Sequence, residues 1–265
     1  MVKKSFVVCL LVSAAVTIHA VGQDLDLAYQ REYFHSSKGF ELPYRILFPE
    51  GYDGDQPYPL IVFLHGAGER GTDNEKQLVH GATLFTREDI RRDYPAIVIF
   101  PQCPEGGYWS SVEIDRTKNP YDLKSDHEKP PTLALEAVAE MVEEISSLEN
   151  VDKERRYIMG LSMGGMGTFE MVYRYPKLFA AAAPICGGGN PDQYDKRVKQ
   201  VAFWLFHGDA DAVVGVDESR QMNQRLQKLK VAELRYTEYP GVNHNSWDSA
   251  FAEPELLPWM FSKRR

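Results

Sequence analysis

Three side chains whose types could together activate a nucleophile follow one another along this chain of 265 residues in the order Ser, Asp, His. Ser162 lies in "GLSMGG", Asp211 ends "HGDAD", and His244 lies in "GVNHNSW". A serine hydroxyl becomes a useful nucleophile only when a neighbouring base accepts its proton, and the histidine that serves as base needs an acid to orient it. The three residues are therefore candidates for nucleophile, acid and base.

The sequence around each candidate favours a catalytic role over a purely structural one. Gly160 and Gly164 place the serine in the pattern G-x-S-x-G, where small residues allow a sharp turn from a strand into a helix. A plain glycine turn, a turn-capping aspartate and a surface histidine are the alternatives, and Asp209 is the second choice for the acid. Because all three candidates follow a predicted strand, we predict that they form a catalytic triad, with His207 ordering the turn that carries the acid.

A second glycine-containing segment, "FLHGAGERG" (63–71), suits the stabilisation of an oxyanion. The backbone N–H groups of Ala67 and Met163 can point at one oxygen, although a plain strand-to-loop turn is the alternative. The segment matches neither phosphate-binding glycine pattern. In "DADAVVGVDE", Val213 stands where a calcium loop needs a ligand. We therefore expect no metal and no cofactor.

Two tryptophans are candidates for substrate contact. Trp109 lies in an irregular stretch, and Trp247 follows His244 by three residues. Aromatic rings suit the faces of sugars or a hydroxycinnamoyl ring, and packing in the core or at the rim is the alternative. For Glu69 and Arg70, we expect pairing with each other rather than hydrogen bonds to substrate.

Short apolar runs that alternate with helical patterns must position these residues. The runs predict strands at 41–50, 58–66, 96–102, 156–162, 179–185, 201–208 and 233–241. The helical patterns lie at 131–148, 163–176 and 217–230. Such alternation is typical of a mostly parallel sheet with helices on both faces. The stretch 104–130 has no such pattern, and we expect a long surface loop there.

The N-terminal segment, the net charge and the cysteines indicate where the protein acts and which partners it lacks. Residues 1–20, with two lysines before an apolar stretch, predict a signal peptide too short to span a membrane; a buried strand is the alternative. We expect cleavage near Ala20 and a secreted or periplasmic catalytic domain over 21–265, without membrane insertion. The net charge of −8 argues against nucleic acid as a partner. Cys103 and Cys186 end predicted strands about 14 Å apart, which favours free thiols over a disulfide.

These motifs make the chain resemble the α/β-hydrolase superfamily and, within it, the secreted feruloyl and acetylxylan esterases. The resemblance is carried by the segment 42–74 and by "FPQCPEGGYW", "GLSMGGMGTFEMVYRYPKLFAAAAPICGGG", "FHGDADAVV" and "GVNHNSW". It implies a mostly parallel eight-stranded sheet in the order 1-2-4-3-5-6-7-8, with one antiparallel strand near the N-terminus. It also implies the same triad and oxyanion amides, and a position for Trp109 near the acyl group.

The activity implied by the resemblance is hydrolysis of carbohydrate-linked feruloyl or acetyl esters of plant polysaccharide through an acyl-enzyme. A serine peptidase or a short-chain or lipolytic esterase of the same fold is one alternative. A noncatalytic binding protein is another, which the intact triad motifs disfavour. Release of acid from an ester without release of amine from an amide would separate an esterase from a peptidase.

Overall fold

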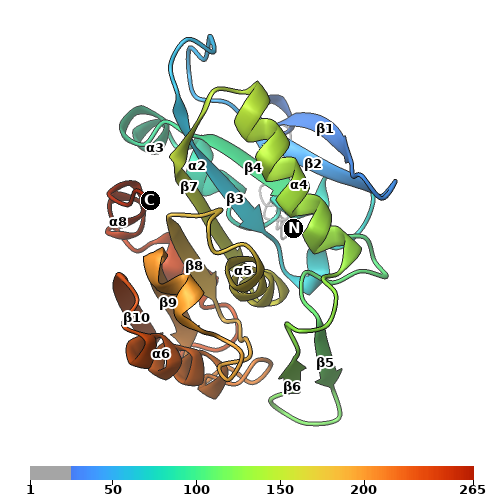
Figure 1. Cartoon of the computed structure of the whole chain (residues 1–265), viewed down its shortest axis with the longest axis vertical. Helices are drawn as coiled ribbons and strands as arrows, with labels where there is room; N and C mark the ends of the chain where they lie inside the picture. Colours follow the sequence, from blue (N-terminus) through green and yellow to red (C-terminus); the bar gives the residue numbers. More distant parts are fainter. Residues whose placement is uncertain (1–24) are drawn as a thin grey trace, which may run out of the picture.

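A computed structural model describes residues 25–265 (Figure 1), and the signal peptide predicted at 1–20 lies outside the described residues. At its centre is an eight-stranded sheet in the order β1-β2-β4-β3-β7-β8-β9-β10. β2 runs antiparallel to both β1 and β4, and the other pairs are parallel. The predicted order 1-2-4-3-5-6-7-8 is therefore confirmed. These strands are β1 (Gln30–His35), β2 (Glu41–Leu47), β3 (Tyr58–Leu64), β4 (Ile97–Pro101), β7 (Val151–Leu161), β8 (Ala181–Ile185), β9 (Ala202–Gly208) and β10 (Glu233–Tyr239).

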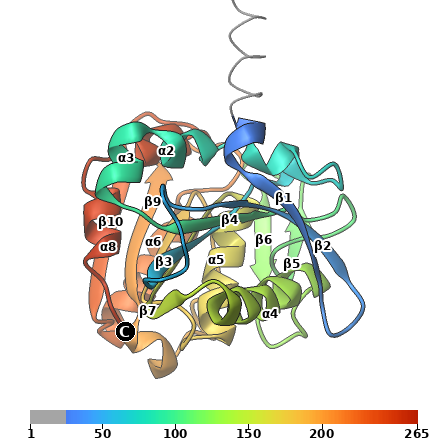
Figure 2. The same ribbon diagram turned by 90° about the horizontal axis from the view of Figure 1, so that it is seen from above.

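Helices cover both faces of the sheet because the inner strands are apolar on both sides. Alternate residues of β3 face opposite cores, with Leu60, Val62 and Leu64 on one side and Ile61 and Phe63 on the other. The first core is closed by α4 (Leu133–Leu148), α5 (Met163–Arg174) and α6 (Asp217–Leu229). The second is closed by α2 (Ala82–Thr86), α7 (Trp247–Phe251) and α8 (Leu256–Phe261). Figure 2 shows α2 and α3 (Glu88–Asp93) on one side of the sheet and α4 and α5 on the other.

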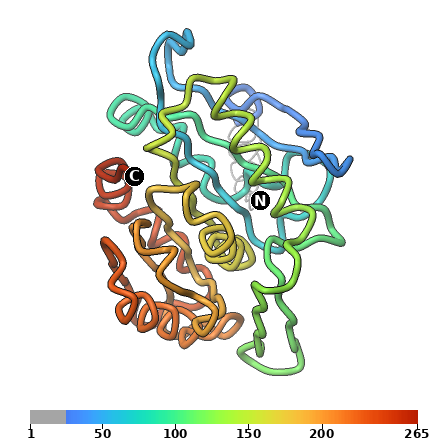
Figure 3. The backbone as a smooth tube through the Cα atoms, in the orientation of Figure 1, coloured from blue at the N-terminus to red at the C-terminus, as the bar shows by residue number. Residues whose placement is uncertain are grey.

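The stretch 104–130 contains a hairpin where the sequence predicted only a loop. β5 (Val112–Asp115) and β6 (Asp122–Ser125) pair antiparallel in a sheet of their own. The hairpin projects away from the body of the molecule, as the backbone trace shows (Figure 3). Each strand has four residues, and a pattern over so few positions does not distinguish a strand from a loop. We refer to residues 104–130 as the arm.

The three predicted helices are confirmed to within two residues at each end. Short 3-10 turns complete the described elements: η1 (Ala67–Glu69), η2 (Lys76–Leu78) and η3 (Lys196–Gln200). Among residues 25–265, no helix combines the length and the apolar character that crossing a bilayer requires.

Cys103 and Cys186 are free and buried, as the sequence favoured. Burial raises the pKa of the Cys103 thiol to about 12 and raises that of Cys186 further. Both thiols are therefore protonated at neutral pH.

Candidate active site

Ser162 lies at a sharp turn between β7 and α5. Its backbone has φ 53° and ψ −115°, a strained conformation for a residue with a side chain. A Cβ on Gly164 would lie 1.9 Å from the Leu64 carbonyl oxygen, and one on Gly160 would lie 2.5 Å from the Gly164 carbonyl oxygen. The Ser162 N–H donates to the Ile185 carbonyl oxygen at 2.9 Å. Backbone contacts with the strands on either side therefore fix the strained turn.

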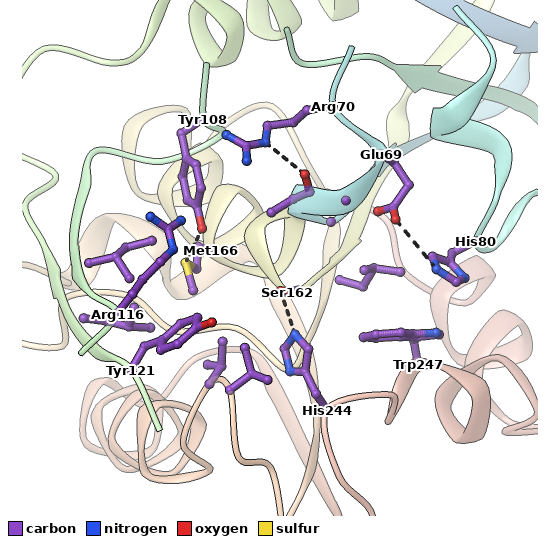
Figure 4. Close-up of a pocket in the computed structure, with 18 residues that line it drawn as sticks. Glu69, Arg70, His80, Tyr108, Arg116, Tyr121, Ser162, Met166, His244 and Trp247 are labelled. Carbon is purple, nitrogen blue, oxygen red and sulfur yellow. Dashed lines mark hydrogen bonds and ion pairs between the residues drawn. The ribbon is translucent and has the colours of Figure 1, made fainter. Parts of the chain in front are cut away.

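The three predicted triad residues meet in one hydrogen-bonded chain. The Nε2 atom of His244 lies 2.9 Å from Ser162 Oγ, and its Nδ1 atom lies 2.7 Å from Asp211 Oδ2. Figure 4 shows the first of these contacts in the middle of a pocket. With the aspartate ionised, Nδ1 carries the proton, and Nε2 is left to accept the proton of the serine. This arrangement can activate the serine hydroxyl as a nucleophile.

Asp211 is oriented by several groups besides His244. Its Oδ1 accepts from the N–H groups of Val213 at 2.8 Å and Val214 at 2.9 Å, and His207 Nε2 lies 3.2 Å from Oδ2. Burial alone would raise the pKa of Asp211, but hydrogen bonds from His207, His244 and the backbone hold it well below its usual range. The carboxylate is therefore charged at neutral pH, and the predicted role of His207 in ordering this turn is confirmed.

The two amides predicted for the oxyanion hole each begin a helix. Ala67 is the first residue of η1 and Met163 the first residue of α5. The N–H of a first helical residue has no partner inside its own helix. Within residues 25–265, neither N–H donates to a backbone carbonyl elsewhere. Both amides are thus available to hold a developing negative charge.

Trp109 does not line the pocket, so the prediction of substrate contact is wrong for this residue. Its side chain is fully buried, and its Nε1 donates to the His65 carbonyl oxygen at 3.1 Å. Gly167 of α5 makes room for it, since a Cβ there would lie 2.5 Å from the Trp109 Cβ. Trp109 therefore packs behind the oxyanion segment and helps to position it.

His65 is a positioning residue that the sequence analysis missed. Its Nε2 accepts from the Cys103 N–H at 3.0 Å, so Nδ1 carries the proton and donates to the Gly66 carbonyl oxygen at 2.6 Å. Burial lowers the pKa of His65 to about 4, so the ring is neutral at pH 7. The ring holds the chain immediately before Ala67. Its only sequence signal is a histidine at the end of an apolar strand.

Ser162 and His244 open into a pocket of about 520 Å³. Trp247 lines this pocket, with its ring 5.2 Å from that of His80, and its contact with substrate stays a prediction. The arm supplies much of one wall (Figure 4), which sequence reasoning missed because the arm carries no clear pattern. The residues of the arm that line the pocket are Tyr108, Ile114, Arg116, Tyr121 and Leu123.

Glu69 and Arg70 both line the pocket but do not pair with each other, contrary to expectation. Arg70 donates to the carbonyl oxygens of Glu105 at 3.0 Å and Gly107 at 3.3 Å. Glu69 Oε1 lies 3.8 Å from His80 Nε2. Figure 4 shows the two side chains turning to different sides of the pocket, so their charges act in different places.

Cys186 lies beside Asp211 and His244, and one ligand atom of each lies within 4.8 Å of the others. This donor set does not suit a metal ion. Burial raises the pKa of the Cys186 thiol, which stays protonated, and metals bind the thiolate. The other two ligand atoms are hydrogen-bonded to each other. The group fits a triad better than a metal centre.

Comparison with known proteins places the chain among esterases. The model of the family described as "Putative esterase" matches residues 36–227. "Probable feruloyl esterase C" from Aspergillus niger is 26% identical over 215 residues, which cover 80% of this chain and 70% of that protein. A bifunctional acetylxylan esterase/xylanase from Neocallimastix patriciarum is 26% identical over 160 residues, which cover 60% of this chain. The matched part spans only 20% of that bifunctional protein.

Solved structures of esterases superimpose on most of this chain. A crystal structure of a thermostable esterase superimposes with a TM-score of 0.81 at 36% identity, covering 91% of this chain and 64% of the other. A ferulic acid esterase from Anaeromyces mucronatus, in complex with ferulic acid, has a TM-score of 0.62 at 16% identity, with coverages of 86% and 89%. The second likeness shows the fold alone. The chain therefore belongs to this esterase family and has the α/β-hydrolase fold.

Proposed function

We propose that this chain is a serine carboxylic ester hydrolase that removes feruloyl or acetyl groups from plant polysaccharide. The observation that carries the proposal is the hydrogen-bonded chain from Asp211 through His244 to Ser162, which opens into a pocket. Membership of an esterase family supports the reaction type. Relatives named as feruloyl and acetylxylan esterases support the substrate class.

In the proposed mechanism, Ser162 Oγ attacks the ester carbonyl carbon while His244 Nε2 accepts the serine proton. The N–H groups of Ala67 and Met163 hold the oxyanion of the tetrahedral intermediate. His244 then returns the proton to the leaving alcohol, and an acyl-enzyme remains. Water, deprotonated by the same histidine, attacks the acyl-enzyme and releases the acid. Asp211 orients the imidazole and stabilises its charged form throughout.

The walls of the pocket fit a sugar or an aromatic acyl group. Trp247, Tyr108 and Tyr121 all line it, and aromatic faces pack well against both kinds of ligand. A volume of about 520 Å³ lies within the range that is usual for small-molecule sites. Action on a polysaccharide outside the cell also agrees with the signal peptide proposed at residues 1–20. N-terminal sequencing of the purified enzyme would test whether that peptide is removed.

One parallel assay tests the proposal. Wild type and Ser162→Ala are compared on methyl ferulate, acetylated xylan, a short-chain nitrophenyl ester and a peptide amide. We expect the wild type to release ferulate or acetate and the variant to lose at least about a thousandfold in kcat. Cleavage of the amide with intact esters would instead indicate a peptidase. Cleavage of the nitrophenyl ester alone would indicate a general short-chain esterase.

The noncatalytic alternative is tested with a serine-directed fluorophosphonate probe. The proposed triad should react with the probe in the wild type and not in Ser162→Ala. A folded wild type that neither reacts nor hydrolyses any substrate would contradict the proposed function.

A further inference from the structure

Two arginines from different parts of the chain point into the same side of the active-site pocket. Arg70 follows η1, and Arg116 lies at the tip of the arm next to β5. Figure 4 shows both guanidinium groups near Tyr108, on the side of Ser162 away from Trp247. The pocket therefore gathers two permanent positive charges on one wall.

Neither guanidinium group has a carboxylate partner in the described part of the chain. Within residues 25–265, no carboxylate oxygen lies within 4.0 Å of a nitrogen of Arg70 or Arg116. Arg70 is anchored by neutral carbonyl oxygens, and Arg116 stands 6.0 Å over the ring of Tyr121. Most other arginines of the described chain do have an acidic partner, as Arg155 has in Asp152.

The opposite wall of the pocket carries the negative charge. Glu69 lies there beside His80, and one of its carboxylate oxygens is buried without a hydrogen-bond partner. An anionic ligand would be repelled from this side and attracted to the arginines on the other. In a chain with a net charge of −8, an uncompensated pair of arginines is a local exception to the overall charge.

We propose that Arg116, assisted by Arg70, binds a carboxylate group of the substrate, so that the preferred ester is acidic. The inference rests on the proposed esterase function and deepens it. A guanidinium group donates in a planar fork that matches a carboxylate, and a charge-assisted hydrogen bond is stronger than a neutral one. The carboxylate is either part of the acyl group or a uronic acid beside the esterified sugar.

Two matched pairs of esters separate these sources of the carboxylate. The first pair is 4-nitrophenyl butyrate and 4-nitrophenyl hemisuccinate, whose acyl chains have the same length and end in a methyl group and a carboxylate, respectively. The second pair is an acetylated xylo-oligosaccharide with and without a glucuronate branch. The measured quantity is the ratio of kcat/KM for the acidic member to that for the neutral member of each pair. Wild type, Arg116→Gln, Arg116→Lys and Lys124→Gln are compared.

Lys124→Gln is the matched control because Lys124 is an exposed cation of the same hairpin that does not line the pocket. We expect the wild type to prefer the acidic member of at least one pair, and Arg116→Gln to lower that ratio about tenfold. Arg116→Lys should keep part of the preference, since it keeps the charge without the fork. Lys124→Gln should keep the full ratio.

Three outcomes count against the proposal. A wild-type ratio near one for both pairs would overturn it while leaving the esterase function intact. An equal fall of the kcat/KM ratio in Arg116→Gln and Lys124→Gln would overturn it too. The preference for acidic esters would then come from the electrostatic field of the whole hairpin and not from contact with Arg116. Failure of the folded wild type to hydrolyse any of the four esters would overturn the proposed function itself, and the inference with it.

Discussion

The turn that carries Ser162 and the hairpin of the arm, which lines one wall of the pocket, are held in different ways. The turn is fixed by backbone-to-backbone contacts inside the sheet, where Gly164 has no room even for a methyl group. The hairpin of the arm (residues 112–125) has exposed charged residues and no buried ones. The sheet therefore fixes the reactive serine, whereas a hairpin outside the sheet supplies much of one pocket wall.

The arm is anchored to the body mainly at its base. At its base, the Ser110 hydroxyl donates to buried Glu170 of α5 at 2.8 Å, and Ser111 N–H donates to the same carboxylate at 2.6 Å. Near its tip, Tyr121 N–H donates to the Val213 carbonyl oxygen at 2.9 Å. The contact of Tyr121 reaches the loop that carries Asp211. The base of the arm belongs to the core through Trp109, whereas none of the hairpin residues 112–125 is buried.

The largest effect is expected from adding one methyl group to the turn. A Cβ in Gly164→Ala would collide with the Leu64 carbonyl oxygen at 1.9 Å, so the strand or the turn must move. We expect unfolding free energy to fall by about 3 kcal/mol or more and esterase activity to be lost. Gly106→Ala in the arm is the control, since a Cβ there meets nothing within 4 Å. Similar losses in both variants would refute the contrast between turn and arm.

A smaller effect is expected from the residue behind the oxyanion segment. In His65→Ala, the chain before Ala67 loses both ring hydrogen bonds, so one oxyanion donor is misplaced. We expect kcat to fall about tenfold to a hundredfold with a smaller change in KM, since such donors act mainly on the transition state. His127→Leu removes a different buried histidine and should leave kcat nearly unchanged. A change in KM alone would speak against a positioning role.

Acid should weaken the body of the protein through the buried side chains of His65 and His127. Burial lowers the pKa of both His65 and His127 to about 4. Below the unfolded-state value near 6.5, the unfolded chain binds more protons than the native one, so stability falls as pH drops from about 6.5 towards 4. Between pH 7 and pH 5, each histidine should cost about 2 kcal/mol of unfolding free energy.

Urea unfolding of wild type and His127→Leu at pH 7 and pH 5 measures this cost. The variant should lose about 2 kcal/mol less than the wild type over that interval. Equal losses would mean that His127 accepts a proton in the folded protein, where its ring packs 5.1 Å from the ring of Tyr173.

The smallest effect on the reaction is expected from removing the hairpin. Its ends already lie together, since Asp126 N–H donates to the Ser111 carbonyl oxygen at 2.9 Å, so a few glycines can replace residues 112–125. We expect kcat/KM for 4-nitrophenyl acetate to fall no more than about threefold, because loops on the surface tolerate such changes. Activity on larger or acidic esters should fall further. A collapse of nitrophenyl acetate hydrolysis would show that the arm supports the acid loop.

The fold and the triad could be predicted from the sequence because their signals are local. The residues around Ser162 encode a strained turn through Gly160 and Gly164, which lie two positions to either side. Asp211 follows β9, an apolar run that is buried throughout, and His244 follows β10, whose residues are all half-buried. The order of the strands came from the resemblance, since sequence alone does not determine which runs pair.

The substrate side of the site could not be predicted because its contacts are not local. Trp109 lies next to Tyr108 in the sequence, yet one is fully buried and the other lines the pocket. Trp109 is accommodated by the space above Gly167 and by its hydrogen bond to the His65 carbonyl oxygen, and both partners are distant in the sequence. Arg116 reaches the pocket because it lies in a hairpin of two four-residue strands. Strands this short show no hydrophobic periodicity from which their pairing could be predicted.

The two buried thiols have a consequence for how the protein is made. Cys103 and Cys186 are unpaired, and burial holds both in the protonated form, which oxidants attack slowly. Folding of residues 25–265 therefore needs no oxidase and no disulfide isomerase. The same native structure should form in a reducing cytoplasm and in the oxidising surroundings where its proposed polymers are found, so added dithiothreitol should leave the yield of active enzyme unchanged.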